Sequence, residues 1–283
     1  MSGPLRAILV GALGALPRAI LYLVLAALVV GIVFPIYYMF AGSLMGPADI
    51  NTFPPSLVPH GLHLQNYQTV FGIIPLGQQY LNSIIMASVI TIAQLTTATL
   101  AAYAFAFLRV PRKRLWFGLF LSTMMVPWEA IIIPNYLTMA EAGLINTYLA
   151  LTLPFLATGF GTFLLRQSFL TFPQDLRDAA FIDGCGHLRF LAQILVPLQR
   201  PALAALGVFA FLGAWSQYFW PLLVTQSPQM QTIQIGISQL KSEDTNDPGS
   251  VMAGVVLAIL PTLALVVFGQ RFVVRGLFAG AVK

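Results

Sequence analysis

The sequence predicts an all-α integral membrane protein with six transmembrane helices. Of its 283 residues, 58% are hydrophobic and only 8% are charged, whereas soluble domains contain about 25% charged residues. The mean hydropathy is +0.83. A soluble fold could not cover its surface with so few charges, and a disordered chain requires low hydrophobicity and high charge. We therefore expect lipid to be the solvent for most of the chain.

Six apolar segments are long enough to cross a bilayer, which requires about 20 residues per helix. The first exceeds the hydrophobic region of a signal peptide and is expected to be a retained helix. The chain then divides into a cytoplasmic N-terminus (1–18) and a six-helix membrane domain (19–283). The predicted spans are 19–42, 83–107, 115–137, 147–170, 202–224 and 251–270.

The distribution of charge predicts the orientation. If both termini are cytoplasmic, every lysine and arginine except Lys241 lies on the inside, as the positive-inside rule requires. The outer loops then carry acidic residues such as Asp49 and Glu141. This rule also accounts for the net charge of +5, so we do not expect nucleic-acid binding.

The sequence contains no recognisable enzyme motif. Cys185 is the only cysteine, and three scattered histidines are too few for a metal cluster. Lys241 is the only lysine that precedes a serine or threonine, and Leu240 occupies the position where a phosphate-binding loop needs glycine. We therefore expect no cofactor on this chain and no catalytic residues. If transport uses ATP, another chain must hydrolyse it.

The inside loop at 171–201 is unusually long and polar. Pro173 suits the first turn of a helix, and the acidic residues that follow suit its positive N-terminal dipole. Gly184 is placed where a helix ends with a left-handed residue. The spacing predicts a short helix with one shallow face, followed by a turn and a second helix. The residues expected on that face are Leu176, Ala179, Ala180 and Asp183.

This loop resembles the EAA loop of ABC-importer permeases, whose core is Glu-Ala-Ala, three residues and Gly. The sequence from Asp178 to Gly184 matches with Asp in place of Glu, and Pro197 and Pro201 follow as in the family. In that family the loop forms a coupling helix that docks into the ATPase subunit. An ordinary amphipathic surface helix is the alternative. The resemblance implies ATPase-coupling roles for Arg177, Asp178, Ala179, Ala180, Asp183 and Gly184.

The resemblance extends to the carbohydrate-uptake permeases, of the maltose and glycerol-3-phosphate type. Asn82-Ser83 and the C-terminal Arg275-Gly276-Leu277 are similar to that group, and the stretch from Trp215 to Leu222 looks closest to its glycerol-phosphate branch. It implies the binding-protein-dependent ABC permease (MetI-like) fold and a role as the second permease of a pair in the inner or plasma membrane. The implied partners are another permease, two ATPase subunits that carry ATP and Mg²⁺, and an extracytoplasmic binding protein.

Candidate residues of the translocation path lie in the third and fifth spans. Glu129, framed by Pro127 and Pro134, is the only acidic residue within a predicted span, although it could also lie at the outer interface. The fifth span carries aromatic and polar groups that suit sugar recognition, or that form an interfacial aromatic belt. These are Trp215, Gln217, Tyr218 and Trp220.

Three other functions remain open from the residues. One is an ABC importer permease for another small solute, an amino acid or a metal. The second is a secondary transporter that works alone, which would need more ion-coupling carboxylates than Glu129 offers. The third is a membrane-embedded enzyme, for which the catalytic groups are missing.

Overall fold

A computed structural model describes residues 3–241 and 247–278, and every regular element in these ranges is a helix. The chain divides into two compact units. One comprises Met1–Gly72 and Leu240–Leu257, and the other comprises Ile73–Gln239 and Ala258–Lys283. The all-α prediction is confirmed.

The first unit contains α1 (Gly3–Gly42), α2 (Pro47–Ile50), most of α3 (Gln65–Ile73) and the start of α15 (Pro248–Phe278). Side chains from residue 20 to 36 of α1 are exposed around the whole helix, as expected for a lipid-facing span. The side-chain amide of Asn66 donates hydrogen bonds to the backbone oxygens of Ser43 and Met45, both at 2.9 Å. These bonds tie α3 to the turn that follows α1.

The second unit is built around α4 (Leu76–Phe107), which packs against α8 (Gly159–Leu170) and α12 (Arg200–Trp215). Small side chains such as Ala98, Ala102 and Ala202 allow the helices to approach closely. The other α-helices that lie wholly in this unit are α5 (Lys113–Ser122), α6 (Trp128–Glu141), α7 (Tyr148–Thr152), α9 (Gln174–Ile182), α10 (His187–Phe190), α11 (Val196–Leu198), α13 (Phe219–Val224) and α14 (Ile233–Gln239). The unit also contains the later part of α15, the 3₁₀ helices Thr123–Met125 and Leu153–Phe155, and the π-helix Leu191–Leu195.

In the part of the chain that the structure describes, three helices are long and apolar enough to cross a membrane unbroken: Ile20–Gly42, Leu76–Phe107 and Pro248–Gln270. Three further spans are bent pairs of helices, which gives six spans if each pair counts as one. The predicted spans at 115–137 and 147–170 coincide with two of these bent pairs, and the predicted span at 202–224 overlaps the third.

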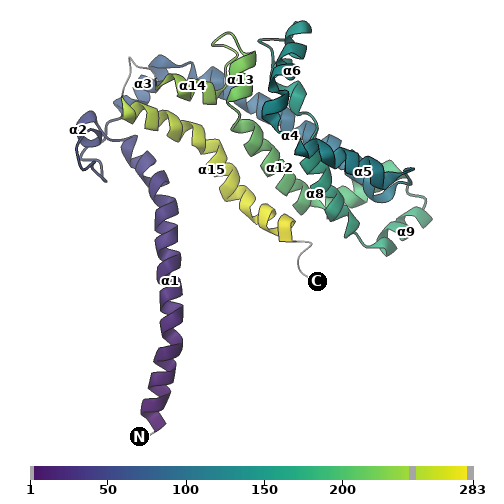
Figure 1. Ribbon diagram of the computed structural model, residues 1–283, viewed down its shortest axis with the longest axis horizontal. Coiled ribbons are helices and arrows are strands. Elements are labelled where there is room, and N and C mark those ends of the chain that lie inside the picture. Colours follow the sequence, from purple (N-terminus) through teal and green to yellow (C-terminus); the bar gives the residue numbers. More distant parts are fainter. Residues whose placement is uncertain (1–2, 242–246, 279–283) are drawn as a thin grey trace. The chain divides into compact units, whose positions relative to one another are not determined.

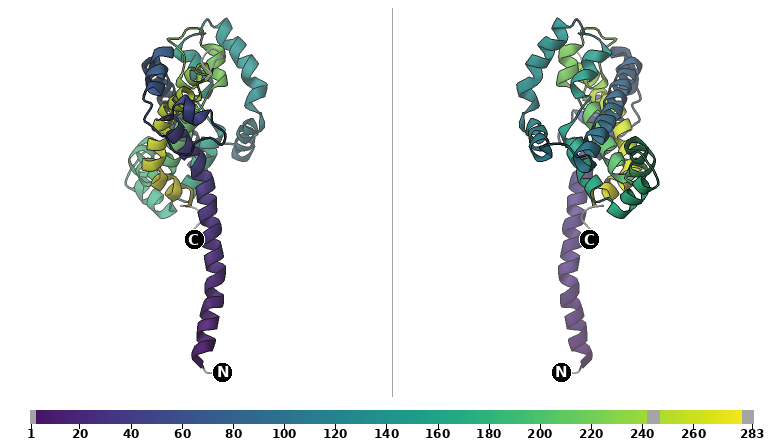
Figure 2. Two further views of the ribbon diagram at one scale, coloured as in Figure 1. Left: turned by 90° about the vertical axis from the view of Figure 1, so that its left-hand side faces the viewer. Right: turned by 90° about the vertical axis from the view of Figure 1, so that its right-hand side faces the viewer.

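The bends within the third and fifth spans have identifiable causes. The third span turns by 92° between Met125 and Trp128, where Pro127 lacks a backbone N–H and disfavours a helical residue before it (Figure 2). The fifth span begins earlier than expected, bends by 82° at Gln199 before Pro201, and ends at Trp215. The predicted segment up to Val224 therefore includes a separate short helix, α13.

The two ends of α4 contact different parts of the second unit. Near its start, Asn82 donates to the backbone oxygens of Gln229 and Gln231, next to α14. Near its end, Tyr103 contacts His187 in α10. These two points are 21 residues apart in one helix, or about 32 Å, which matches the thickness of the hydrocarbon core. The loop that contains α9 and α10 and the segment that contains α14 therefore lie at opposite ends of this unit (Figure 1).

Candidate functional site: a coupling loop and a transmembrane pocket

The helix α9 ends in a hydrogen-bonded left-handed turn. Gly184 has a φ of +77°, and its N–H donates to the backbone oxygen of Phe181 at 3.1 Å. The N–H of Cys185 donates to the backbone oxygen of Ala180 at 3.0 Å. This pair of bonds is the Schellman arrangement that glycine favours. The prediction that Gly184 takes a left-handed conformation is confirmed.

One face of α9 packs against other helices of the second unit. Phe181 contacts the rings of His187 and Phe190, with centroid distances of 5.0 and 5.4 Å. Ala180 is only 7% exposed and belongs to the apolar cluster that includes Phe169 and Phe190. The prediction that Ala180 shares a free face with Leu176 and Ala179 is wrong. The ring of Phe181 packs against His187 and Phe190, and the neighbouring Ala180 lies on the same buried side of the helix.

The other face of α9 is free. Leu176 is 53% exposed and Ile182 is 85% exposed. Ala179 and Asp183, on the same side of the helix, are exposed as well. Large apolar side chains that are exposed on a polar loop outside the spans are typical of a surface that another protein covers. This face therefore has the chemistry of a docking surface.

Two neighbouring charges lie beside this face. Arg177 donates from Nε and Nη2 to the same oxygen of Asp178, Oδ1, at 2.9 and 2.7 Å. The guanidinium group also lies over the ring of Phe107, 5.9 Å from its centroid. The other carboxylate oxygen of Asp178 accepts no hydrogen bond from the described residues, and it stays available to a partner.

Polar side chains connect this loop to the spans. The hydroxyl of Tyr103 in α4 forms a 2.7 Å hydrogen bond with Nδ1 of His187 in α10. Ser168 in α8 donates to Oε1 of Gln199 at 2.6 Å, at the bend before α12. Sequence reasoning did not identify this role for either pair. A polar residue at the boundary of an apolar run was the available signal, but it does not identify the partner.

The two tryptophans of the predicted path are packed inside the second unit. Trp215 and Trp220 are each 1% exposed. The indole N–H of Trp215 donates to the backbone oxygen of Ala258 at 3.1 Å, and that of Trp220 donates to Ala150 at 2.8 Å. Both indoles are therefore already paired within the chain.

The other path candidates have different environments. Glu129 is exposed in the first turn of α6, directly after the sharp bend, where a carboxylate favours the positive end of the helix. Tyr218 is half-buried before α13, and its ring contacts Phe219. Of the predicted path residues, Gln217 lines a pocket between helices.

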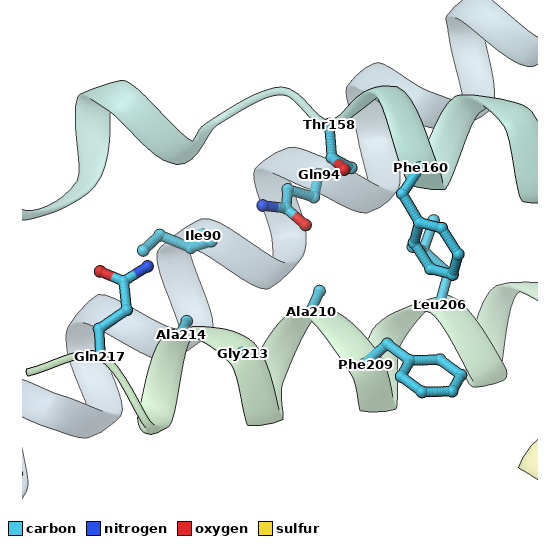
Figure 3. A pocket seen from close by; sticks show the side chains of 10 residues that line it. All are labelled: Ile90, Gln94, Thr158, Phe160, Leu206, Phe209, Ala210, Gly213, Ala214 and Gln217. Atoms are coloured by element: carbon cyan, nitrogen blue, oxygen red, sulfur yellow. The ribbon is translucent and has the colours of Figure 1, made fainter. Parts of the chain in front are cut away.

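That pocket has a volume of about 280 Å³ and lies between α4, α8 and α12 (Figure 3). Its polar side chains are Gln94, Thr158 and Gln217. Its other walls are formed by Ile90, Phe160, Leu206, Phe209, Ala210, Gly213 and Ala214. No group of three or more potential metal ligands occurs in the parts of the chain that the structure describes.

The family model described as "binding-protein-dependent transport system inner membrane component" matches residues 94–278, more than half of the chain. The chain belongs to this family. It is therefore a membrane-embedded permease subunit of an ABC transport system, a transporter component and not an enzyme. Its membership places it in the cell membrane and implies a substrate-binding protein and an ATPase as partners.

Several relatives match over nearly their whole length. The sn-glycerol-3-phosphate transport system permease protein UgpE of Agrobacterium fabrum is 41% identical over 271 residues, which cover 92% of this chain and 95% of the relative. The protein of the same name from Rhizobium meliloti is 39% identical, over 90% of this chain and 94% of the relative.

A solved structure supports the fold. A bacterial ABC transporter involved in the import of the acidic polysaccharide alginate contains a chain that superposes on this one with a TM-score of 0.82. The match covers 91% of this permease and 96% of the other chain, at 22% sequence identity.

Proposed function

We propose that this permease carries glycerol 3-phosphate or a related sugar or polyol. In this proposal it forms half of a translocation path with a second permease, above two ATPase subunits and below an extracytoplasmic binding protein. The names of the relatives at about 40% identity support the cargo class. They disfavour the alternatives of an amino-acid or metal importer and of a transporter that works alone.

The exposed face of α9 is the observation that carries the coupling role. Leu176, Ala179 and Ile182 form an apolar strip that a cleft in the ATPase subunit would cover. The free oxygen of Asp178 would pair with a basic or amide group at the edge of that cleft. ATP and Mg²⁺ would bind to the ATPase, since this sequence lacks a phosphate-binding loop. Gly184 and Asp183 would shape the end of the docked helix.

The same loop is built to transmit motion. The buried side of α9 packs against Phe190, and the Tyr103–His187 hydrogen bond connects α10 to α4. Packed aromatic cores move as rigid pieces because they resist compression. A displacement of α9 by nucleotide-driven closure of the ATPases would therefore be passed to α4, α8 and α12. Those helices would alternate between inward-facing and outward-facing states.

The substitution Ile182→Asp tests the docking face. Ile182 is 85% exposed, so the change leaves the core of the chain intact. We expect the purified variant to lose most of its co-purifying ATPase subunit and nearly all ATP-driven uptake. The matched control is Leu62→Asp, which changes an exposed leucine in the connection between α2 and α3.

The control is expected to retain the ATPase subunit in full. Normal assembly and normal uptake in the Ile182→Asp variant would refute the proposed docking. Equal loss of the ATPase in both variants would show a general defect and would also count against this surface.

A further inference from the structure

We infer that the pocket between α4, α8 and α12 binds an uncharged, hydroxylated part of the cargo, and that the side-chain amides of Gln94 and Gln217 recognise its hydroxyl groups. The inference rests on the proposed transport function and deepens it, because it assigns a step of cargo recognition to this chain. Figure 3 shows the amide of Gln94 on α4 and the amide of Gln217, in the segment just after α12, extending toward the same space.

The pocket owes its space to one face of α12. Ala210, Gly213, Ala214 and Gln217 follow the three- and four-residue spacing that places side chains on one side of a helix. The first three have little or no side chain, so the wall recedes. Gln217 then closes the end of this face, since its backbone N–H still bonds to Ala214. A cavity with one polar end results.

The two side-chain amides differ in which of their atoms already form hydrogen bonds within the chain. Nε2 of Gln94 donates to the backbone oxygen of Phe155 at 2.8 Å, which holds this amide in place. Its oxygen accepts no hydrogen bond from the described residues and can serve a ligand. Oε1 of Gln217 is enclosed and has no hydrogen-bond partner in the described part of the chain.

An unpaired amide oxygen between membrane helices is unfavourable, because neither lipid nor apolar side chains can donate to it. A ligand hydroxyl relieves this cost when the amide of Gln217 turns to meet it. Hydroxyl groups suit the pair because each can donate to one amide oxygen and accept from an amide N–H.

The electrostatics of the pocket exclude a charged group as its preferred ligand. None of the 10 lining residues is charged. A phosphate that entered would lose hydration without gaining a counter-charge, which is costly at low dielectric. Phe160 and Phe209 offer apolar faces to C–H groups instead. The phosphate of a sugar or glycerol phosphate would therefore be recognised outside this pocket.

The test compares two cargoes that differ by one hydroxyl group. The full complex, reconstituted in proteoliposomes with its ATPase and binding protein, is supplied with glycerol 3-phosphate or with 3-hydroxypropyl phosphate, which lacks the central hydroxyl. The variants are Gln217→Met and Gln94→Met, which keep side-chain length and remove the amide. The control is Gln167→Met, an exposed glutamine of α8 that does not line the pocket.

We expect each pocket variant to lower the uptake rate of glycerol 3-phosphate about tenfold, equivalent to about 1.4 kcal/mol. Uptake of the deoxy compound, which keeps only its terminal hydroxyl, should fall clearly less, by no more than about threefold relative to its own rate in the unmodified complex. ATPase stimulation by the loaded binding protein should persist and would show that the variants fold and assemble. A purely structural role would slow both cargoes equally, and that result would overturn the inference.

Failure of the proposed cargo has a different signature. If the unmodified complex takes up neither phosphate, the cargo assignment is wrong, and the comparison is repeated with maltose and its deoxy derivatives. Equal effects of Gln217→Met on maltose and on every deoxy derivative would then overturn the pocket inference by itself.

Discussion

The adjacent alanines of the coupling loop provide a sharp test, because they lie about 100° apart around the same short helix and have different surroundings. Ala180 is 7% exposed among aromatic side chains, whereas Ala179 is exposed. We compare Ala179→Asp with Ala180→Asp. The two variants introduce the same charge one residue apart, so intrinsic helix propensity is the same in both and only the environment differs.

The magnitude follows from the burial of a carboxylate. At position 180 the new Asp would be enclosed by the aromatic cluster, so it would be protonated on folding or would stay charged at low dielectric. Protonating an Asp with an ordinary pKa of about 3.9 at pH 7 costs about 4 kcal/mol. An unpaired buried charge costs about 3–5 kcal/mol. Position 179 carries almost none of this cost.

The assay measures the chain and its assembly separately. Thermal unfolding of the purified permease in detergent reports the stability of the chain, and co-purification of the ATPase subunit reports docking. We expect Ala180→Asp to lower the unfolding temperature strongly. We expect Ala179→Asp to leave unfolding nearly unchanged and to weaken only the association. Equal unfolding temperatures for the two variants would refute the assigned orientation of α9.

Two further predictions concern the turn after α9 and the outer loop. Gly184→Ala should destabilise the end of α9 by about 1–2 kcal/mol, because its φ of +77° is unfavourable for alanine although no atom lies near the added methyl group. Faster hydrogen exchange at Cys185 would show this, and Gly184→Asn should be milder. A side-chain hydrogen bond from His60 holds the pKa of Asp49 below its usual value, so the bond stabilises the loop above about pH 4 and is lost as the pH falls below it. Proteolysis at pH 3 and 7 should therefore differ in the unmodified chain, and Asp49→Asn should be cleaved more readily at pH 7; equal cleavage of both chains at pH 7 would contradict this role.

Features with a local cause were predictable. The number of spans follows from the lengths of the apolar segments, and the left-handed conformation of Gly184 follows from its position after a short helix. The bend at Pro127 was available in principle, since proline removes a backbone donor wherever it occurs. The span bounds of 115–137 were set by hydropathy, which does not register the break.

The sequence by itself determined that this chain is a membrane protein, how many times it can cross the bilayer, and where its inside loop forms a short helix. Those properties depend on the solvation of each segment and on bonds between near neighbours. Only the tertiary structure decided which alanine of that helix is buried, that Trp215 is bonded to a carbonyl 43 residues away, and that Gln94 and Gln217 share a pocket. Helical periodicity places residues on a common face, but it does not say which neighbour that face will meet.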